Sequence, residues 1–380
     1  MTDTFPADSV GLVTPQVAHF DDPFTFVNGA VLQSHQLVYE TYGELNRAGD
    51  NAVLICHALS GSHHAAGFHS ADERRPGWWD LAIGPGKPID TARLFVVCSN
   101  NLGCCDGSSG PNTTNPSTGE AWGGQFPQPQ VQDWVRSQKR LAEHLGITKW
   151  AAVIGGSLGG MQALQWTIDF PDWVGHCVAL AAAPGLTAQN IAFNEIARHA
   201  ILSDPDWREG AYLSEGTLPA RGVALARMVG HLTYMSADGM SDRFGRELRE
   251  GGFSPDENAE WVFQVESYLR HQGSRFSTQF DANTYVLMTR ALDLFDLTGS
   301  QGGLAAVLSR AQAEFLVASF SSDWRFPPQR SIEIRDALMA AGKPVTYANI
   351  ETDNGHDGFL LPNPSYEQLL KEWMRRVGPS

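Results

Sequence analysis

The chain has 380 residues, of which 42% are hydrophobic and 18% charged, a balance typical of soluble globular proteins. Its formal net charge of −15 argues against nucleic-acid binding, because no basic stripe is present to neutralise phosphates. No run of about 18 apolar residues occurs, and the N-terminus lacks the basic and apolar regions of a signal peptide, so we expect a cytoplasmic protein. The five cysteines form neither a CxxC motif nor a disulfide framework.

Short apolar segments typical of buried parallel strands recur along the chain, with helical patterns between them. In chain order these segments are residues 52–56, 94–98, 151–154, 177–182, 315–320 and 345–350. The stretches 132–145 and 329–341 fit helices that cross from one strand to the next. This alternation predicts an α/β fold with a mostly parallel, doubly wound sheet.

The alternation stops between residues 185 and 308, where helical periodicity occurs without strand character. The helical patterns there are residues 191–202, 223–235, 260–268 and 283–295. Because this region is inserted between two sheet strands, we expect a helical lid at 185–308 over a catalytic domain made of 1–184 and 309–380. The alternative is a set of decorating helices with no role in access.

The sequence GGSLG at residues 155–159 follows an apolar segment and precedes a helix-compatible stretch. A strand, a sharp glycine turn and a helix in this order predict a nucleophile elbow, in which Ser157 has a strained backbone and a neighbouring Cβ would clash. The unpaired N–H groups of the helix would face the charge that develops during acyl transfer. The alternative is an ordinary glycine turn with an incidental serine.

A serine nucleophile needs a base, and the base needs a partner that orients it. In α/β-hydrolase folds these residues follow in the order Ser, Asp or Glu, His. Asp323 comes directly after the strand predicted at 315–320, and His356 follows the last predicted strand in a glycine-rich loop. We therefore expect Ser157, Asp323 and His356 to form a catalytic triad.

Backbone N–H groups are expected to stabilise the oxyanion of the acyl-transfer step. One would come from Leu158, directly after the nucleophile, and one from the loop 57–61, at Leu59. His57 is interpreted as part of the turn that positions these donors.

Four early histidines suggest a metal site, namely His57, His63, His64 and His69. A carboxylate at the spacing of a zinc site is missing, so we expect no metal.

Several segments together resemble the homoserine O-acyltransferase family of the α/β-hydrolase fold, and among its members homoserine O-succinyltransferases most. They are NAVLICHALSG (51–61), PGWWD (76–80), GPGKPID (84–90), NLG (101–103), GSSGP (107–111), GGSLGGMQA (155–163), AQNIAFN (188–194) and FDANTY (280–285). The resemblance runs from about residue 8 to the C-terminus, and these motifs are far longer than the serine elbow.

The resemblance implies the first committed step of methionine biosynthesis, in which an acyl group passes from acyl-CoA to Ser157 and then to the γ-hydroxyl of homoserine. Such a shared serine predicts ping-pong kinetics. It also implies no permanently bound cofactor, acyl-CoA as co-substrate, and a homodimer built through the helical lids. Arg227 matches the residue that binds the substrate carboxylate, and Asp357 matches the one that meets its ammonium group. Without the resemblance, Arg227 would read as a surface charge of a helix.

Arg325 bears on the choice of acyl donor. Acetyl-transferring members resemble Asp-Trp-Leu at this point, whereas this chain has Asp323-Trp324-Arg325. A succinyl group ends in a carboxylate that an arginine could pair with, while an acetyl group would leave a buried arginine unpaired. We therefore favour succinyl-CoA, with acetyl-CoA as the alternative; Arg325 could instead point to solvent or pair with a nearby carboxylate.

Two further alternatives remain open. One is a serine esterase of the same fold, in which water rather than homoserine resolves the acyl-enzyme. The other is a hydrolase-fold protein that has lost catalysis and serves as a binding module.

Overall fold

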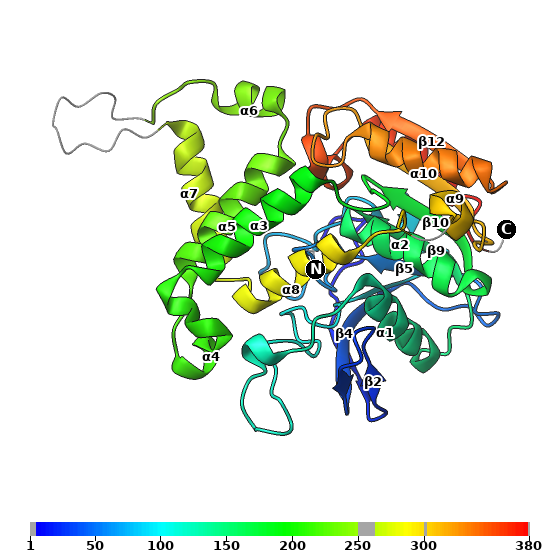
Figure 1. Ribbon diagram of the computed structural model, residues 1–380. Coiled ribbons are helices and arrows are strands. Elements are labelled where there is room, and N and C mark those ends of the chain that lie inside the picture. The colour runs from blue at the N-terminus through cyan, green and yellow to red at the C-terminus, as the bar shows by residue number, and fades with distance from the viewer. Residues whose placement is uncertain (1–4, 250–262, 300–301, 379–380) are drawn as a thin grey trace.

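The structure is a computed structural model that describes residues 5–249, 263–299 and 302–378 (Figure 1). Residues 1–4, on which part of the signal-peptide argument rests, lie outside the described residues. The same holds for residues 260–262 of the helix expected at 260–268. Within the described part no helix combines the length and apolar character needed to cross a membrane.

An eight-stranded sheet forms the centre of the molecule, in the order β1-β4-β8-β5-β9-β10-β11-β12. From β8 to β12 neighbouring strands pair in parallel, while β4 pairs antiparallel with both β8 and β1. The strands are β1 (Gln16–Phe20), β4 (His35–Tyr42), β5 (Ala52–Cys56), β8 (Phe95–Ser99), β9 (Trp150–Gly156), β10 (Val174–Leu180), β11 (Glu314–Phe320) and β12 (Val345–Ile350). The fold class and the six expected strands are confirmed, with shifts of up to three residues at their ends.

Strands β1 and β4 were not expected from the sequence. β1 lies at the edge of the sheet and is mostly exposed, so it has no apolar run. β4 is largely buried but carries polar residues such as His35 and Glu40, and Glu40 is hydrogen-bonded to His64 and His69 of a later segment. Short strand pairs lie outside the sheet: β2 (Phe24–Thr25) with β3 (Val31–Leu32), and β6 (Ile83–Gly84) with β7 (Ile89–Asp90).

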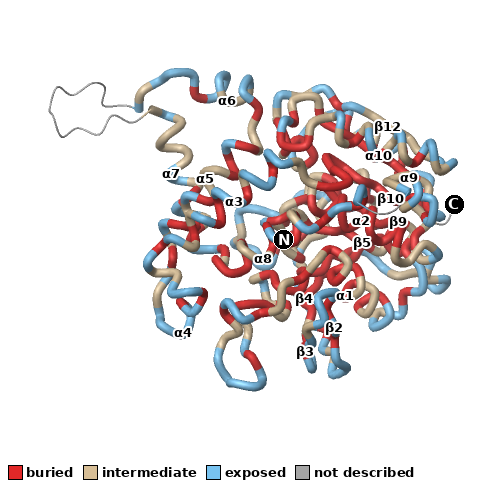
Figure 2. The backbone as a smooth tube through the Cα atoms, in the orientation of Figure 1, coloured by how far each residue is buried: buried red, intermediate tan, exposed pale blue. Residues whose placement is uncertain are grey.

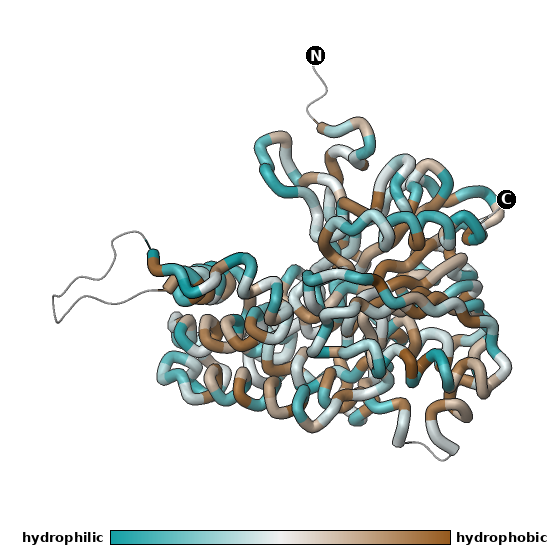
Figure 3. The backbone as a smooth tube through the Cα atoms, turned by 90° about the horizontal axis from the view of Figure 1, so that it is seen from above, coloured by the Kyte–Doolittle hydropathy of each residue, from teal (hydrophilic) through white to brown (hydrophobic). Residues whose placement is uncertain are grey.

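Both faces of the sheet are buried under apolar layers. Side chains alternate along a strand, so Leu54 and Cys56 of β5 join one core cluster while Val53 and Ile55 join the other. The first cluster includes residues of α1 (Val131–His144), α2 (Leu158–Asp169), α9 (Gly303–Leu308) and α10 (Pro328–Ala340). The second includes residues of α11 (Pro364–Met374). Figure 2 shows the buried residues concentrated in the strands, and Figure 3 shows the most hydrophobic stretches in the same body.

A group of helices between β10 and β11 lies to one side of the sheet (Figures 1 and 3). It contains α3 (Ala188–Leu202), α4 (Tyr212–Glu215), α5 (Ala220–Tyr234), α6 (Ala237–Phe244), α7 (Gln264–Ser277) and α8 (Ala282–Leu294). α5 packs against both α3 and α7. Helix α9, which falls within the expected lid segment, packs instead against α10 and α2.

The starts of α3 and α8 are set by capping side chains rather than by the first apolar residue. Thr187 accepts a hydrogen bond from the N–H of Asn190 at the start of α3, and Asp281 caps α8 through Thr284. These caps explain why α3 begins three residues before the expected residue 191 and α8 one residue before 283. Single-turn 3₁₀ helices occur at Gly123–Gln125 and Pro171–Trp173, and longer ones at Pro205–Gly210 and Gly355–Leu360.

Candidate active site

Ser157 stands on a sharp turn between β9 and α2. Its backbone angles, φ 55° and ψ −122°, are ones that a residue with a side chain rarely adopts. A Cβ on Gly155 would collide with the backbone of Gly159, and a Cβ on Gly159 with the carbonyl group of Cys56. The flanking glycines therefore allow the backbone to fold closely enough to present the serine at the carboxyl end of the strand.

The structure brings Ser157, His356 and Asp323 into one hydrogen-bonded chain. His356 Nε2 lies 2.7 Å from Ser157 Oγ, and His356 Nδ1 lies 2.7 Å from Asp323 Oδ2. The carboxylate can only accept, so Nδ1 carries the proton and Nε2 is free to accept the serine proton. Asp323 is held in turn by the N–H of Phe326, and both Asp323 and His356 are buried. This arrangement can activate a serine for attack on a carbonyl carbon.

The loop after β5 is held beside the serine by His57. Its ring donates from Nδ1 to the carbonyl oxygen of Ala58 at 2.8 Å, and Nε2 accepts from the N–H of Asn101 at 3.1 Å. Burial lowers the pKa of His57 to about 4, so the ring is neutral and can accept at Nε2. Gln162 of α2 also donates to the His57 carbonyl oxygen, which ties this loop to the helix that follows Ser157.

The expected oxyanion donors, Leu59 and Leu158, lie on these two segments. Leu158 is the first residue of α2, where backbone N–H groups have no acceptor within the helix. Leu59 is buried in the loop after β5. Their assignment as donors stays a prediction.

Three of the early histidines surround a carboxylate that their spacing along the chain did not reveal. Glu40 of β4 is fully buried; its Oε2 lies 3.0 Å from His64 Nδ1, and its Oε1 lies 2.5 Å from His69 Nε2. His63 Nε2 is 3.7 Å from Glu40 Oε1. The candidate ligand atoms of Glu40, His64 and His69 all lie within 4.8 Å of one another, so this cluster could hold a metal ion.

Hydrogen bonds account for the same cluster without an ion. Two ligands of one tetrahedral zinc ion lie about 3.4 Å apart, whereas Glu40 and His69 approach to hydrogen-bonding distance. Tyr42 donates to Glu40 Oε2 at 2.7 Å and accepts from the N–H groups of Ala65 and Ala66. The cluster thus connects β4 to the segment that follows the oxyanion loop, and the expectation of no metal stays a prediction.

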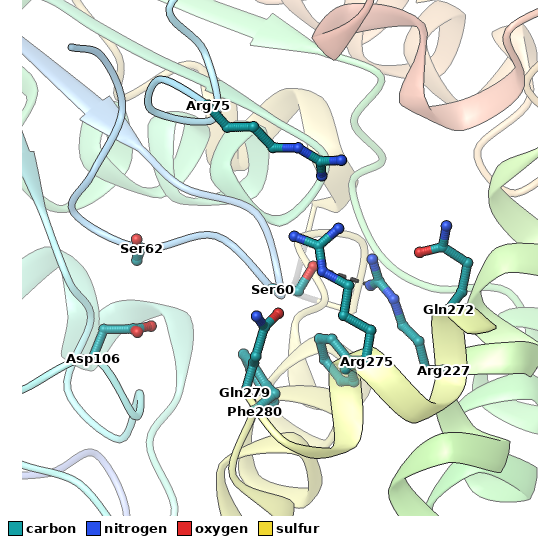
Figure 4. A pocket seen from close by; sticks show the side chains of 10 residues that line it. Ser60, Ser62, Arg75, Asp106, Arg227, Gln272, Arg275, Gln279 and Phe280 are labelled. Atoms are coloured by element: carbon teal, nitrogen blue, oxygen red, sulfur yellow. Dashed lines mark hydrogen bonds between the residues drawn. The ribbon is translucent and has the colours of Figure 1, made fainter. Parts of the chain in front are cut away.

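Arg227 and Asp357 lie close to the triad from opposite parts of the chain. Arg227 comes from α5 and donates to Ser60 Oγ at 3.3 Å (Figure 4). Asp357 follows His356 directly; burial raises the pKa of its carboxyl, while the nearby positive charge of Arg227 lowers it. A guanidinium and a carboxylate therefore lie near each other beside His356.

Arg325 is 6% exposed, although it carries a charge. Its guanidinium donates to Thr233 Oγ1 at 2.9 Å and to Asn194 Oδ1 at 3.2 Å, both of them neutral acceptors. Among the residues that the structure describes, it makes no ion pair, although its charge contributes to lowering the pKa of Asp357. Arg325 therefore points neither to solvent nor to a paired carboxylate.

Tyr234 was not singled out by the sequence. Its ring lies 5.4 Å from the Arg325 guanidinium, 5.9 Å from that of Arg227 and 6.1 Å from the ring of His356. It is the last residue of α5, and nothing in the local pattern distinguishes it from an ordinary packing aromatic. Only the packing of α5 against α3 and against the 3₁₀ helix Gly355–Leu360 brings it close to both arginines and to His356.

Comparison with known proteins places this site in a family. The chain matches the family model of the alpha/beta hydrolase fold over residues 51–361. A homoserine O-succinyltransferase of Stutzerimonas stutzeri (strain A1501) is 60% identical over 378 residues, which cover 99% of this chain and 100% of that protein. One of Teredinibacter turnerae is 58% identical over 379 residues, 99% of each chain. The chain belongs to the homoserine O-acyltransferase family. The family expected from the sequence motifs is thus confirmed.

Solved structures related to this homoserine O-acyltransferase chain differ in the activity that they are named for. The homoserine O-acetyltransferase from Bacillus anthracis has a TM-score of 0.89 at 30% identity, covering 97% of this chain and 99% of that one. Esterase E22 has a TM-score of 0.87, also at 30% identity, covering 96% of this chain and 100% of its own. Since acyltransferases and an esterase share this architecture, the acceptor must be decided by the site.

Proposed function

We propose that the protein transfers the succinyl group of succinyl-CoA to the γ-hydroxyl of L-homoserine, giving O-succinyl-L-homoserine and CoA in methionine biosynthesis. The hydrogen-bonded chain from Asp323 through His356 to Ser157 carries this proposal. Similarity over the whole chain to curated homoserine O-succinyltransferases supports the acceptor and the donor.

In the first half-reaction Ser157 Oγ attacks the thioester carbonyl carbon while His356 Nε2 takes its proton. Asp323 holds the imidazole by its Nδ1–H and stabilises the positive charge that forms. The tetrahedral oxyanion accepts hydrogen bonds from the N–H groups of Leu158 and Leu59, each typically worth about 3 kcal/mol. The C–S bond then breaks, His356 gives the proton to the leaving sulfur, and succinyl-Ser157 remains.

In the second half-reaction the γ-hydroxyl of homoserine attacks the acyl-serine. His356 Nε2 takes the hydroxyl proton and then returns it to Ser157 Oγ as the ester bond to the enzyme breaks. CoA leaves before homoserine is acylated, so the kinetics should be ping-pong.

Arg227 and Asp357 are proposed to bind the two charged groups of homoserine. A guanidinium matches both oxygens of a carboxylate, and the carboxyl of Asp357 would accept from the ammonium group. Bound to Arg227 and Asp357, homoserine would hold its γ-hydroxyl toward Ser157 and compete with water for the acyl-enzyme.

Arg325 supports succinyl-CoA as the donor. Within the described residues its buried guanidinium has only neutral hydrogen-bond partners and no ion pair, and a buried charge held in this way is costly in an interior of low dielectric. The terminal carboxylate of a succinyl group would compensate it, and an acetyl group would not.

We further propose that helices α3 to α8 form a lid and that two copies associate through it. Exposed apolar residues occur on four of these helices, with Leu225 and Leu232 one heptad apart on α5, Ile196 on α3, Leu213 on α4 and Leu294 on α8. We place the reaction in the cytoplasm, where acyl-CoA is used; five free cysteines fit a reducing compartment.

The likeness to esterase E22 makes hydrolysis of the acyl-enzyme the second candidate function. The two are separated by measuring release of the CoA thiol from succinyl-CoA with and without homoserine, and by mass spectrometry of the products. We expect thiol release to depend on homoserine and to match the O-succinylhomoserine formed. Equal rates of CoA release with and without homoserine would favour the hydrolase and contradict the proposal.

A further inference from the structure

A pocket of about 400 Å³ opens between the loop that follows β5 and helices α5 and α7 (Figure 4). Ser60 and Ser62 line it from the loop, and Arg227 lines it from α5. Because Arg227 also reaches Ser60 and lowers the pKa of Asp357, the pocket adjoins the catalytic centre. A volume of this size suits part of a large ligand rather than an amino acid alone.

Three arginines converge on this space. Arg75 comes from the segment between β5 and β6, Arg275 from α7, and their guanidinium groups point into the same hollow as that of Arg227 (Figure 4). None of the three makes an ion pair within the described ranges 5–249, 263–299 and 302–378. Asp106 lies on the opposite wall and is the acidic residue of the lining. A chain with a net charge of −15 thus concentrates positive charge here.

The three arginines of the pocket differ in how far they are exposed to solvent. Arg75 and Arg275 are exposed, whereas Arg227 is half-buried and packs over the ring of Phe276 at 4.5 Å. One cation, Arg227, is enough for the single carboxylate of homoserine. The two outer arginines are therefore left for another anionic group that enters from solvent.

We propose that Arg75 and Arg275, with the amides of Gln272 and Gln279, bind the phosphate groups of the acyl-CoA donor. This inference rests on the proposed function and adds to it the residues that hold the nucleotide end of the donor. CoA carries its phosphates at the end of a long pantetheine arm, so a thioester at Ser157 requires phosphate partners at the outer end of the pocket. Planar guanidinium groups bind phosphate oxygens in pairs, and amides add neutral donors.

The test compares donors with and without phosphates on the full-length protein. Arg75→Gln, Arg275→Gln and the double variant are assayed with succinyl-CoA and with succinyl-N-acetylcysteamine, which has the thioester but no phosphate. Arg221→Gln is the matched control, since Arg221 lies on the lid helix α5, is exposed and does not line the pocket. We expect kcat/KM for succinyl-CoA to fall roughly tenfold for each arginine, with the KM for homoserine unchanged.

For succinyl-N-acetylcysteamine, kcat/KM should stay within about twofold of the unmodified protein, because that donor has no phosphate for the arginines to bind. The control should resemble the unmodified protein with both donors. Equal losses with both donors would mean that the arginines support the fold of the lid, and no loss with either would also overturn the inference.

Binding of CoA itself, measured by calorimetry, separates affinity from chemistry. The affinity should fall in the double variant in parallel with kcat/KM, and it should weaken steeply with salt. Loss of dimer in light scattering with unchanged CoA affinity would assign the arginines to a second copy instead. If the unmodified protein shows no succinyl transfer to homoserine, the proposed function fails; if it does and the variants match it, only this inference fails.

Discussion

His356 Nε2 lies 2.7 Å from Ser157 Oγ although 199 residues separate them along the chain. The two side chains meet because β9 and β12 end at the same edge of one parallel sheet, with β10 and β11 between them. The loop after β11 brings Asp323 to the far side of the imidazole. A site assembled in this way depends on the order of the strands and on each loop keeping its conformation.

Replacing Asp323 by Asn should lower kcat about 10⁴-fold, because the amide would favour the wrong imidazole tautomer. Steady-state kinetics with succinyl-CoA and homoserine measure this, and circular dichroism checks that the fold is kept.

Ser157→Ala should abolish formation of the acyl-enzyme, as measured by mass spectrometry. Undiminished acyl transfer in that variant would contradict the mechanism, whereas no acyl transfer by the unmodified protein would favour a binding module.

Replacing Arg325 by Leu should reverse the donor preference. Leucine cannot pair with the succinyl carboxylate as the buried guanidinium would. The ratio of kcat/KM for succinyl-CoA to that for acetyl-CoA should therefore fall about tenfold to a hundredfold. Arg330→Leu, on the neighbouring helix α10, is the control for loss of an arginine. A ratio that does not change would refute the charge-pairing argument.

Replacing Glu40 by Gln should destabilise the protein by about 3 kcal/mol, since it removes the charge and replaces one of the two oxygens that accept from two histidines and a tyrosine with an NH2 donor. Urea unfolding measures this, with the exposed Glu44→Gln as control. Hydrogen bonds to the carboxylate keep the pKa of Glu40 low despite burial. Its contribution is therefore present above the unfolded pKa and is lost as the pH falls through the folded pKa.

The cluster of Glu40, His64 and His69 also allows a prediction about metal binding. If it is a hydrogen-bond network, dialysis against a chelator should leave both the melting temperature and kcat unchanged. A fall in either that added Zn²⁺ restores would instead assign an ion to Glu40, His64 and His69.

The stability of the protein should fall as the pH drops from about 6.5 to about 4. Burial lowers the pKa of His57 from 6.5 to about 4, so in this window the unfolded chain binds the proton and the folded protein does not. His57 alone would contribute up to about 3 kcal/mol, fully present above pH 6.5. Urea unfolding at pH 7 and pH 5 should show a smaller pH effect in His57→Gln than in the exposed His199→Gln. Equal slopes in both variants would contradict this.

Local patterns were sufficient for the parts of this protein that depend on neighbouring residues. The residues around Ser157 predict a strand, a close glycine turn and a helix. Asp323 and His356 could then be chosen because each follows a predicted strand in the order Ser, Asp, His. Strand β4 was not predicted, because its buried Glu40 interrupts the apolar pattern and is hydrogen-bonded to His64 and His69, 24 and 29 residues further along the chain. Helix starts shifted where a cap such as Thr187 lay before the first apolar residue.

The amino-acid sequence by itself determined the sheet segments, the nucleophile turn and the residues able to serve as acid and base, since these are set by side-chain periodicity and backbone sterics over a few residues. Only the tertiary structure decided that Glu40 meets His64 and His69, that Arg325 is buried among neutral acceptors, and that Tyr234 stands between two arginines. Such contacts join segments 24 to 131 residues apart, as His64 to Glu40 and Arg325 to Asn194. Their energies depend on burial and on the local dielectric, which exist only once the strands and the lid helices have packed.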